Sequence, residues 1–360
     1  MKCKRVFIFG AGFSKPAGMP LATELLSPLF ERLRLDEMRE WLDGMRERLA
    51  WLSGQDVDHA SLKLNIEQVF HYAHFDAEVY RLRQHVAPVG RGDGPGTPWN
   101  QAESIGAWLS YLERDLCDVI LDAETKSDLS QINRWAQSTT ENDTILTFNY
   151  DTLVERALVQ SGKHWHHGMG CDSDCGIPVF KLHGSMDWIV AHRQEPFPKF
   201  DLLFDKKNSN QSDGKTGHIE DDYRLWRCRS GEQLRNWIEG RDLQMVGVGA
   251  SPSSVGIAGL GAYKELYRIP GLGHVWAGGM RALYQADWAV VVGFSMSDFD
   301  AMAQMQFAEV VRARVREARP LRVLVVDPFM DQVKERIQRV FRSVDFIAQR
   351  HEDFDWSKVE

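Results

Sequence analysis

The chain has 360 residues, of which 43% are hydrophobic and 26% charged, and its 43 Lys and Arg against 51 Asp and Glu give a formal net charge of −8. This composition is typical of a globular protein and excludes a disordered chain. The negative net charge provides no general attraction to nucleic acid, so direct nucleic-acid binding is not expected. Five cysteines are a sparse, odd set that does not fit a disulfide framework. Residues 2–16 have no small-residue cleavage site after their short apolar run, and no apolar stretch approaches the length of a membrane span. We therefore expect a cytoplasmic protein without membrane contact.

Five short apolar runs predict buried strands of a parallel sheet: 6–9, 144–148, 178–182, 289–292 and 321–326. Between the first two, apolar residues recur at three- and four-residue spacing, which predicts a helical insertion from approximately 22 to 140. Strands that alternate with helices indicate an α/β fold with a Rossmann-like parallel sheet. A variable region at approximately 191–250 matches no pattern that can be interpreted.

The first strand ends in Gly10-Ala11-Gly12-Phe13-Ser14. Glycines at this point let the backbone turn tightly and come close to a ligand phosphate. Lys15 occupies the third glycine position of the dinucleotide-binding fingerprint, so the motif is incomplete. A purely structural turn between strand and helix remains the alternative.

Polar residues follow three of the other predicted strands. Thr147 lies at the end of the second strand and Asn149 and Asp151 follow it, where the alternative role of Asn149 or Asp151 is to cap the next helix. His183 and Gly184 follow the third strand, and a buried structural histidine is the alternative there. Gly293, Ser295 and Asp300 follow the fourth, where an ordinary turn with a helix cap would also fit.

The four motifs share one position, because each follows the carboxyl end of a predicted parallel strand. Ligands of open α/β sheets bind at that edge, so the motifs predict a common crevice. Their order along the chain resembles that of the sirtuins, from Gly-Ala-Gly-x-Ser with Ala17-Gly18-Met19-Pro20 through Thr-x-Asn-x-Asp to Leu-His-Gly.

The resemblance is closer to the bacterial SIR2-like family associated with antiphage defence. Asn65-Ile66-Glu67, Thr-Phe-Asn-Tyr-Asp, Lys-Leu-His-Gly-Ser and the late Gly-Phe-Ser-Met are typical of that family, and the similarity covers about residues 4–330. It implies a sirtuin-type sheet and a single SIR2-like domain over 1–360.

Two departures argue against protein deacylation. Deacylating sirtuins carry Asp-Phe-Arg where Leu21-Ala22-Thr23 stands here, and they hold zinc with two Cys-x-x-Cys pairs after the catalytic histidine. This chain has only Cys171-x3-Cys175, which precedes His183. With His164, His166 and His167 these cysteines are an alternative metal site. Their spacing fits no zinc module, so we expect a surface loop and no metal.

The resemblance implies an NAD glycohydrolase that cleaves NAD to ADP-ribose and nicotinamide as an antiphage effector. His183 would contact the ribose hydroxyls as general base, Asn149 would orient the ribose and the attacking water, and Asp151 would hold the carboxamide or support Asn149. The expected cofactor-binding residues are Gly10, Ala11, Gly12, Phe13, Ser14, Thr147, Gly293, Ser295 and Asp300.

Unrestrained NAD hydrolysis would kill the host, so the activity needs control. Because the SIR2-like segment nearly fills the chain, we expect that control to come from a homo-oligomer, a separately encoded sensor or ATPase partner, or both. Two alternatives are a module that binds NAD or another nucleotide without turnover, and a deacylase or ADP-ribosyltransferase, which the missing zinc module disfavours.

Overall fold

A seven-stranded parallel sheet forms the centre of the molecule, in the order β11-β10-β9-β1-β2-β4-β3. The computed structural model describes residues 4–33, 36–52, 65–86, 98–169, 176–192, 200–205, 223–241, 254–258 and 269–359. The strands are β1 (Arg5–Phe9), β2 (Thr144–Thr147), β3 (Trp165–His166), β4 (Ile177–Lys181), β9 (Trp288–Val292), β10 (Arg322–Val326) and β11 (Asp345–Ile347). The predicted α/β class and parallel sheet are confirmed.

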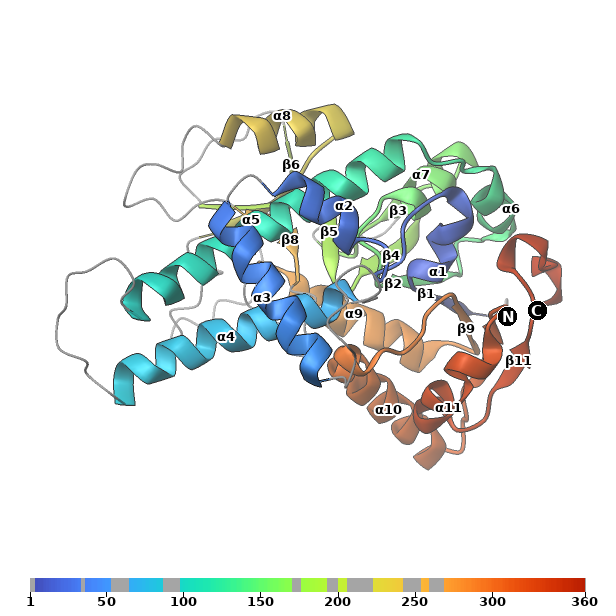
Figure 1. Ribbon diagram of the computed structural model, residues 1–360. Helices are drawn as coiled ribbons and strands as arrows, with labels where there is room; N and C mark the ends of the chain where they lie inside the picture. Colours follow the sequence, from blue (N-terminus) through green and yellow to red (C-terminus); the bar gives the residue numbers. More distant parts are fainter. Residues whose placement is uncertain are drawn as a thin grey trace.

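The two faces of this sheet are buried in two separate hydrophobic cores. Alternate residues of a strand point to opposite faces, so Phe7 and Phe9 of β1 join one core while Val6 and Ile8 join the other. The second core is covered by α9 (Leu272–Gln285), α10 (Ala301–Arg316) and α11 (Met330–Phe341), which lie together below the sheet in Figure 1. Burial on both faces is the reason that the strands read as continuous apolar runs.

The first core is covered by the helices between β1 and β2, together with α7 (Leu153–Gln160). These helices are α1 (Ala11–Ser14), α2 (Leu26–Arg32), α3 (Asp36–Leu52), α4 (Ile66–Val86), α5 (Pro98–Thr125) and α6 (Ser130–Ser138). Figure 1 shows α3, α4 and α5 extending away from the sheet. A helical insertion after the first strand is thus confirmed, although the loop residues 87–97 lie outside the described part.

A second sheet, which the sequence analysis missed, packs beside the first. Its order is β6-β7-β5-β8, and its pairings are antiparallel. The strands are β5 (Gly184–His192), β6 (Asp201–Phe204), β7 (Tyr223–Arg227) and β8 (Ser254–Ile257), accompanied by α8 (Gly231–Arg241). The region at 191–250 therefore supplies β6, β7 and α8. Its residues 193–199, 206–222 and 242–250 lie outside the described part.

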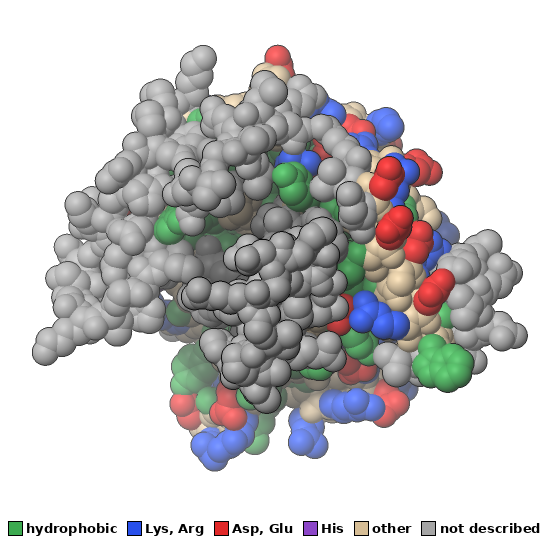
Figure 2. All heavy atoms as spheres, turned by 60° about the vertical axis from the view of Figure 1, so that its left-hand side comes forward, with side chains coloured by type: hydrophobic (Ala, Val, Ile, Leu, Met, Phe, Trp, Pro, Cys, Tyr) green, Lys and Arg blue, Asp and Glu red, His purple; other side chains and the backbone are tan. Residues whose placement is uncertain are grey.

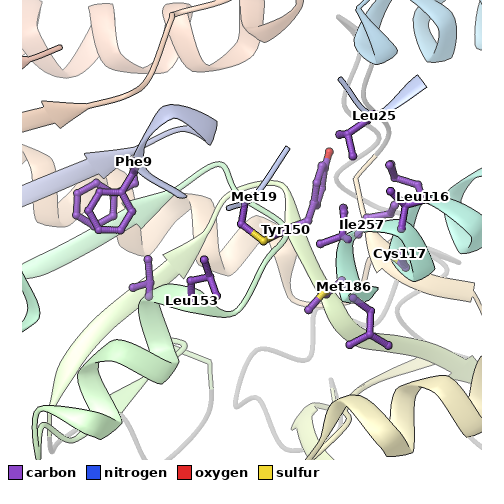
Figure 3. Close-up of a cluster of buried hydrophobic side chains, with 14 of the residues drawn as sticks. Phe9, Met19, Leu25, Leu116, Cys117, Tyr150, Leu153, Met186 and Ile257 are labelled. Atoms are coloured by element: carbon purple, nitrogen blue, oxygen red, sulfur yellow. The ribbon is translucent and has the colours of Figure 1, made fainter. Parts of the chain in front are cut away.

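The insertion, the parallel sheet and the second sheet share the first core. Figure 3 shows Phe9 of β1, Leu116 and Cys117 of α5, and Met186 and Ile257 of the second sheet in one cluster of buried side chains. Because all three layers bury apolar surface together, none of them is an independently stabilised appendage.

The surface carries both signs of charge in mixture. In Figure 2, Lys and Arg side chains lie among Asp and Glu side chains on the right and along the lower edge of the visible surface. Several are paired, for example Arg229 with Asp201 and Arg339 with Glu335. Within the described residues, no helix is both long and apolar enough to cross a membrane.

Three glycines join β1 to β9 at the switch point of the sheet, where the chain order changes direction. Gly10 donates its amide to Val292 O at 3.2 Å and Gly12 donates to Gly293 O at 2.9 Å. A Cβ on Gly293 would lie 2.3 Å from Gly12 C, and Gly293 itself has a φ of +57°. The two backbones therefore touch, with no room for a side chain between them.

We predict that Gly293→Ala destabilises the protein by about 2–4 kcal/mol, because the new methyl group meets backbone and the left-handed φ disfavours alanine. Gly44→Ala is the matched control, since no atom lies within 4 Å of a Cβ at that position of α3. There the change should stabilise by about 0.5–1 kcal/mol, as alanine favours helix. Urea unfolding of both variants measures the difference. Equal effects would contradict the close packing.

Candidate active site

A cavity of about 390 Å³ opens at the carboxyl ends of β1, β2, β4, β9 and β10. This is the edge at which open α/β sheets bind ligands. It brings together most of the residues predicted from the four motifs: Gly10, Ala11, Gly12, Ser14, Asn149, Asp151, His183, Gly293, Ser295 and Asp300.

Phe13 and Thr147 are the two predicted residues that do not line the cavity. Phe13 is buried, with its ring stacked on Phe9 at a centroid distance of 3.8 Å. Thr147 is also buried, and its hydroxyl accepts the amide proton of Asn149 at 3.1 Å. Both residues are therefore buried beneath the loops that line the cavity, and their contacts stabilise those loops.

The loop after β1 packs closely against the loop after β9 in this structure. The amides of Gly12 and Phe13 donate to the carbonyls of Gly293 and Gly10, both at 2.9 Å. These two amides are thus engaged within the protein, whereas the sequence analysis expected them to face a phosphate. The exposed Ser295 remains in the lining as a group that can donate to a ligand, whereas the Ser14 hydroxyl is hydrogen-bonded to Asp151, which works against the rise in the pKa of that carboxyl.

Asn149 is fixed from both its backbone and its side chain. Its Nδ2 donates to Ser14 Oγ at 3.0 Å, which connects the end of β2 to the loop after β1. Only 6% of the residue is exposed, although it lines the cavity. A carboxamide held in this way presents a defined polar atom to a ligand.

Asp151 precedes Thr152, the N-cap residue of α7, and satisfies the first amide of that helix, which is close to the capping role that the sequence left open. Its Oδ1 accepts the amide proton of Leu153 at 3.1 Å. Burial raises the pKa of Asp151, and the charge of Lys181 opposes that rise. Because Asp151 also lines the cavity, capping does not remove it from the site.

His183 is held at the junction of the two sheets. Its ring packs edge-on against Phe148 at a centroid distance of 4.9 Å, and its Nε2 lies 3.0 Å from Asp300 Oδ1. The following Gly184 has a φ of +78°, and a Cβ there would lie 2.0 Å from Gly256 O of β8. The glycine after the histidine is thus required by the close approach of the second sheet.

Acidic side chains line the cavity on several sides. Glu67, Asp300 and Asp327 join Asp151, and neither Lys nor Arg occurs among the described lining residues. Burial raises the pKa of Asp327, and the hydrogen bond from the Phe329 amide opposes that rise. Carboxylates favour a positive charge in the ligand or in the transition state.

Glu67, Asp327 and Phe329 line the cavity in addition to the predicted residues. Asp327 directly follows the apolar strand β10, the same pattern that identified Asn149 after β2. An acidic residue at the end of such a strand suits a ribose hydroxyl. Glu67 lies in the insertion, and no local pattern connects that helix to the sheet edge.

A buried ion pair lies directly beneath the turn that carries Asn149 and Asp151. Lys181 is fully buried, and its Nζ lies 3.2 Å from Glu155 Oε1. The same Nζ donates to the backbone carbonyl of Asp151. Burial raises the pKa of Glu155, and the charge of Lys181 opposes that rise. This pair fixes the turn from below.

The helical insertion also contacts the turn that carries Asn149 and Asp151. Glu124 of α5 accepts the Thr152 amide proton at 2.8 Å and the Thr152 hydroxyl proton at 2.5 Å. Burial raises the pKa of Glu124, and the nearby charge of Asp151 adds to the rise. A shift of α5 would therefore move the turn.

The predicted alternative of a metal site at 164–175 lies partly outside the described residues, which stop at 169 and resume at 176. His166 Nδ1 accepts the Gly168 amide proton at 3.0 Å. His167 is buried, and burial lowers its pKa to about 3. Within the described chain, no group of three or more His, Cys, Asp or Glu side chains is arranged to hold a metal ion.

No protein-family model matches the chain, and no curated protein matches it. Its fold is similar to solved structures of Sir2 proteins and sirtuins. A crystal structure of a Sir2 homologue–NAD complex is 13% identical with a TM-score of 0.40, covering 97% of this chain and 85% of that one. Sir2 bound to acetylated peptide is 13% identical with a TM-score of 0.40, covering 99% and 91%. A structure concerning sirtuin substrate affinity is 15% identical with a TM-score of 0.39, again covering 99% and 91%. At these identities and TM-scores the likeness concerns the fold and carries nothing about activity.

We predict that Lys181→Met destabilises the protein by about 3–5 kcal/mol at pH 8, because it leaves Glu155 charged and buried without its cation. In this variant the carboxyl pKa rises further above its unfolded value. The folded state then binds the proton more tightly than the unfolded state, so stability returns as the pH falls. Urea unfolding at pH 8 and pH 5 measures both effects.

The double variant Lys181→Met/Glu155→Leu is the control for this prediction. Removing both partners leaves no buried charge, so a large part of the lost stability should return at pH 8. A double variant as unstable as the single one would show that the pair itself is not what stabilises the turn.

Proposed function

We propose that this protein is an NAD glycohydrolase, in which NAD and water give ADP-ribose, nicotinamide and a proton. The observation that carries the proposal is the convergence of Asn149, His183 and Asp300, from the segments that follow three different strands, on one cavity at the switch point. The ordered motifs of the SIR2-like family lie on these same residues.

The charge of the cavity supports this chemistry. The nicotinamide of NAD leaves from a cationic pyridinium, and the ribose passes through an oxocarbenium-like transition state. Both carry positive charge, and carboxylates in a partly closed site stabilise such charge more strongly than water does. Glu67, Asp151 and Asp300 supply this environment.

In this proposal the chain's polar residues divide the remaining tasks. His183 polarises a ribose hydroxyl or accepts a proton from the attacking water. Asn149, held by Ser14, orients the ribose and the water. Asp327 accepts hydrogen bonds from the second ribose, and the exposed ring of Phe329 offers a surface on which a base can stack.

Control of the activity belongs to the same proposal. We infer that self-assembly or a separately encoded partner regulates the enzyme in a cytoplasmic antiphage role. The insertion is the element through which such a contact would act, because Glu67 lines the cavity and Glu124 holds the turn at Thr152 beside it.

The test is incubation of the purified protein with NAD, followed by chromatography of nicotinamide and ADP-ribose. We predict turnover by the parent protein and a loss of about a hundredfold or more in His183→Ala and in Asn149→Ala, because each removes a group that acts in the transition state. His164→Ala and Asn142→Ala, at exposed positions, are the matched controls and should keep the parent activity.

Absence of nicotinamide release from the parent would contradict the hydrolase. Calorimetry with NAD then distinguishes between the remaining hypotheses about the cavity. Binding without turnover would favour a nucleotide-binding module, and absence of binding would exclude NAD as the ligand. Release of nicotinamide only in the presence of an acetylated peptide would favour a deacylase.

A further inference from the structure

The chain continues beyond the last strand of the parallel sheet and returns to the first core. After β11 it forms two short helices, η6 (His351–Asp353) and η7 (Trp356–Lys358), which contact α6 and lie at the right of Figure 1. We call residues 348–359 the C-terminal strap. The strap lies outside the part of the chain that resembles the SIR2-like family, so that resemblance implies no role for it. Three of its side chains are buried in the first core: Phe354, Trp356 and Val359.

His351 connects the strap to the loop after β1. Its Nε2 lies 2.9 Å from the Phe13 carbonyl oxygen, and the two rings are stacked at a centroid distance of 4.8 Å. Both residues are buried, and only 4% of His351 is exposed. Because a carbonyl oxygen can only accept a hydrogen bond, the contact requires a proton on Nε2, which His351 donates.

The surroundings of the imidazole agree with this direction of donation. Burial lowers the pKa of His351, while the charge of Glu352 and the hydrogen bond to Phe13 oppose the fall. Glu352 Oε2 is 3.8 Å from Nε2, which is beyond hydrogen-bond distance. A neutral ring carries one proton, so Nδ1 has none when Nε2 donates, and among the described residues Nδ1 has no hydrogen-bond partner. The contact to Phe13 is therefore the polar interaction through which this ring acts.

The strap is anchored on both sides of His351. On one side, Arg134 Nη1 of α6 donates to the Glu352 carbonyl oxygen at 2.7 Å. On the other, the ring of Trp356 packs edge-on against Phe7 of β1 at a centroid distance of 6.0 Å. Because β1 leads directly into the loop that His351 contacts, these anchors hold the histidine in a fixed place relative to that loop.

The helix α1 depends on contacts of this kind. It has only four residues, so its carbonyls lie in the last turn and lack the usual intrahelical partners, and its N-cap Gly10 makes no side-chain hydrogen bond. The Phe13 ring packs on Phe9 and Trp135 at centroid distances of 3.8 and 5.2 Å. His351 adds a polar contact to the backbone of the same residue.

The Phe13 carbonyl belongs to the peptide group that joins Phe13 to Ser14. A peptide group is planar, so a contact that fixes its oxygen also fixes the direction in which the chain enters Ser14. The Ser14 hydroxyl accepts a proton from Asn149 Nδ2 at 3.0 Å and is hydrogen-bonded to Asp151. One peptide plane thus separates the His351 contact from the residue that holds Asn149.

We propose that His351 is a positioning residue, which donates from Nε2 to the Phe13 carbonyl and thereby holds Ser14 where it orients Asn149. The proposal gives the C-terminal strap a role in the candidate site, although none of its residues is in the lining of the cavity. Its effect on catalysis rests on the proposed NAD hydrolysis. The tautomer of His351 and the environment of Asn149 can be measured without any turnover.

The first test is the tautomer of His351, measured by 15N-histidine NMR on the full chain at pH 8, with its signal assigned from His351→Gln. We predict a neutral ring that is protonated at Nε2, because the Phe13 carbonyl accepts that proton. A ring protonated at Nδ1 alone, or a charged ring, would overturn the proposal.

The second test separates the hydrogen bond from the packing. His351→Phe keeps a ring on Phe13 but loses the donor, so we predict shifted side-chain amide signals of Asn149 and a kcat lowered on the order of fivefold to tenfold, with a smaller change in KM. His351→Gln keeps an amide donor close to the position of Nε2 and should restore both the signals and most of kcat.

Val359→Ala is the control, because it weakens the packing of the strap and leaves His351 intact. It should lower stability in urea unfolding while the Asn149 signals and kcat stay close to those of the parent. A loss of kcat in Val359→Ala equal to that in His351→Phe would show that the strap only stabilises the fold, and would overturn the positioning role.

The outcomes distinguish this inference from the proposed function. If the parent shows no NAD turnover, but His351→Phe shifts the Asn149 signals and His351→Gln does not, the positioning role stands and the hydrolase is contradicted. If the parent turns over NAD, but His351→Phe changes neither the Asn149 signals nor kcat, the hydrolase stands and the positioning role is overturned.

Discussion

The contact between the backbones of Gly10, Gly12 and Gly293 determines how the rest of the site is built. These residues lie where β1 and β9 separate at the switch point, and the Cβ positions are occupied by neighbouring backbone. Because no side chain fits, the loops after the two strands touch. That proximity places Ser14 beside Asn149 and brings the loop carrying Asp300 to His183. The geometry of the candidate site is a consequence of glycine packing between two strands.

Two carboxylates, that of buried Glu124 and that of half-buried Glu67, connect the insertion to this edge. Glu124 of α5 holds the turn at Thr152, and Glu67 of α4 holds the loop at Ser297. Both contacts are polar and part-buried, so the loss of either partner would leave a partly shielded polar group without its hydrogen bond. A helical layer that merely covered the sheet would have no need of such contacts. Their presence couples the position of the insertion to the arrangement of the site.

The sequence predicts the central sheet and the location of the site well, because both depend on local patterns. Apolar runs identify strands buried on both faces, and a polar residue directly after such a run identifies a residue at the ligand edge. The same reasoning applied to β10 would have found Asp327. It could not find the second sheet, whose strands β6, β7 and β8 are short and lie in a region without clear periodicity. It also could not find Glu67 as a neighbour of Ser297, because that contact joins residues 230 positions apart. Nor could it show that Asp300 faces the histidine and not only the ligand.

The central claim is that the carboxyl edge of the sheet binds NAD with its nicotinamide ribose beside His183. The most direct measurement is a crystal structure of Asn149→Ala with NAD, in which impaired turnover preserves the dinucleotide. The account predicts electron density for the nicotinamide ribose between His183 and position 149, with the diphosphate beside the loop of Gly10 and Gly12. A dinucleotide bound elsewhere, or an empty cavity in crystals grown at saturating NAD, would contradict it.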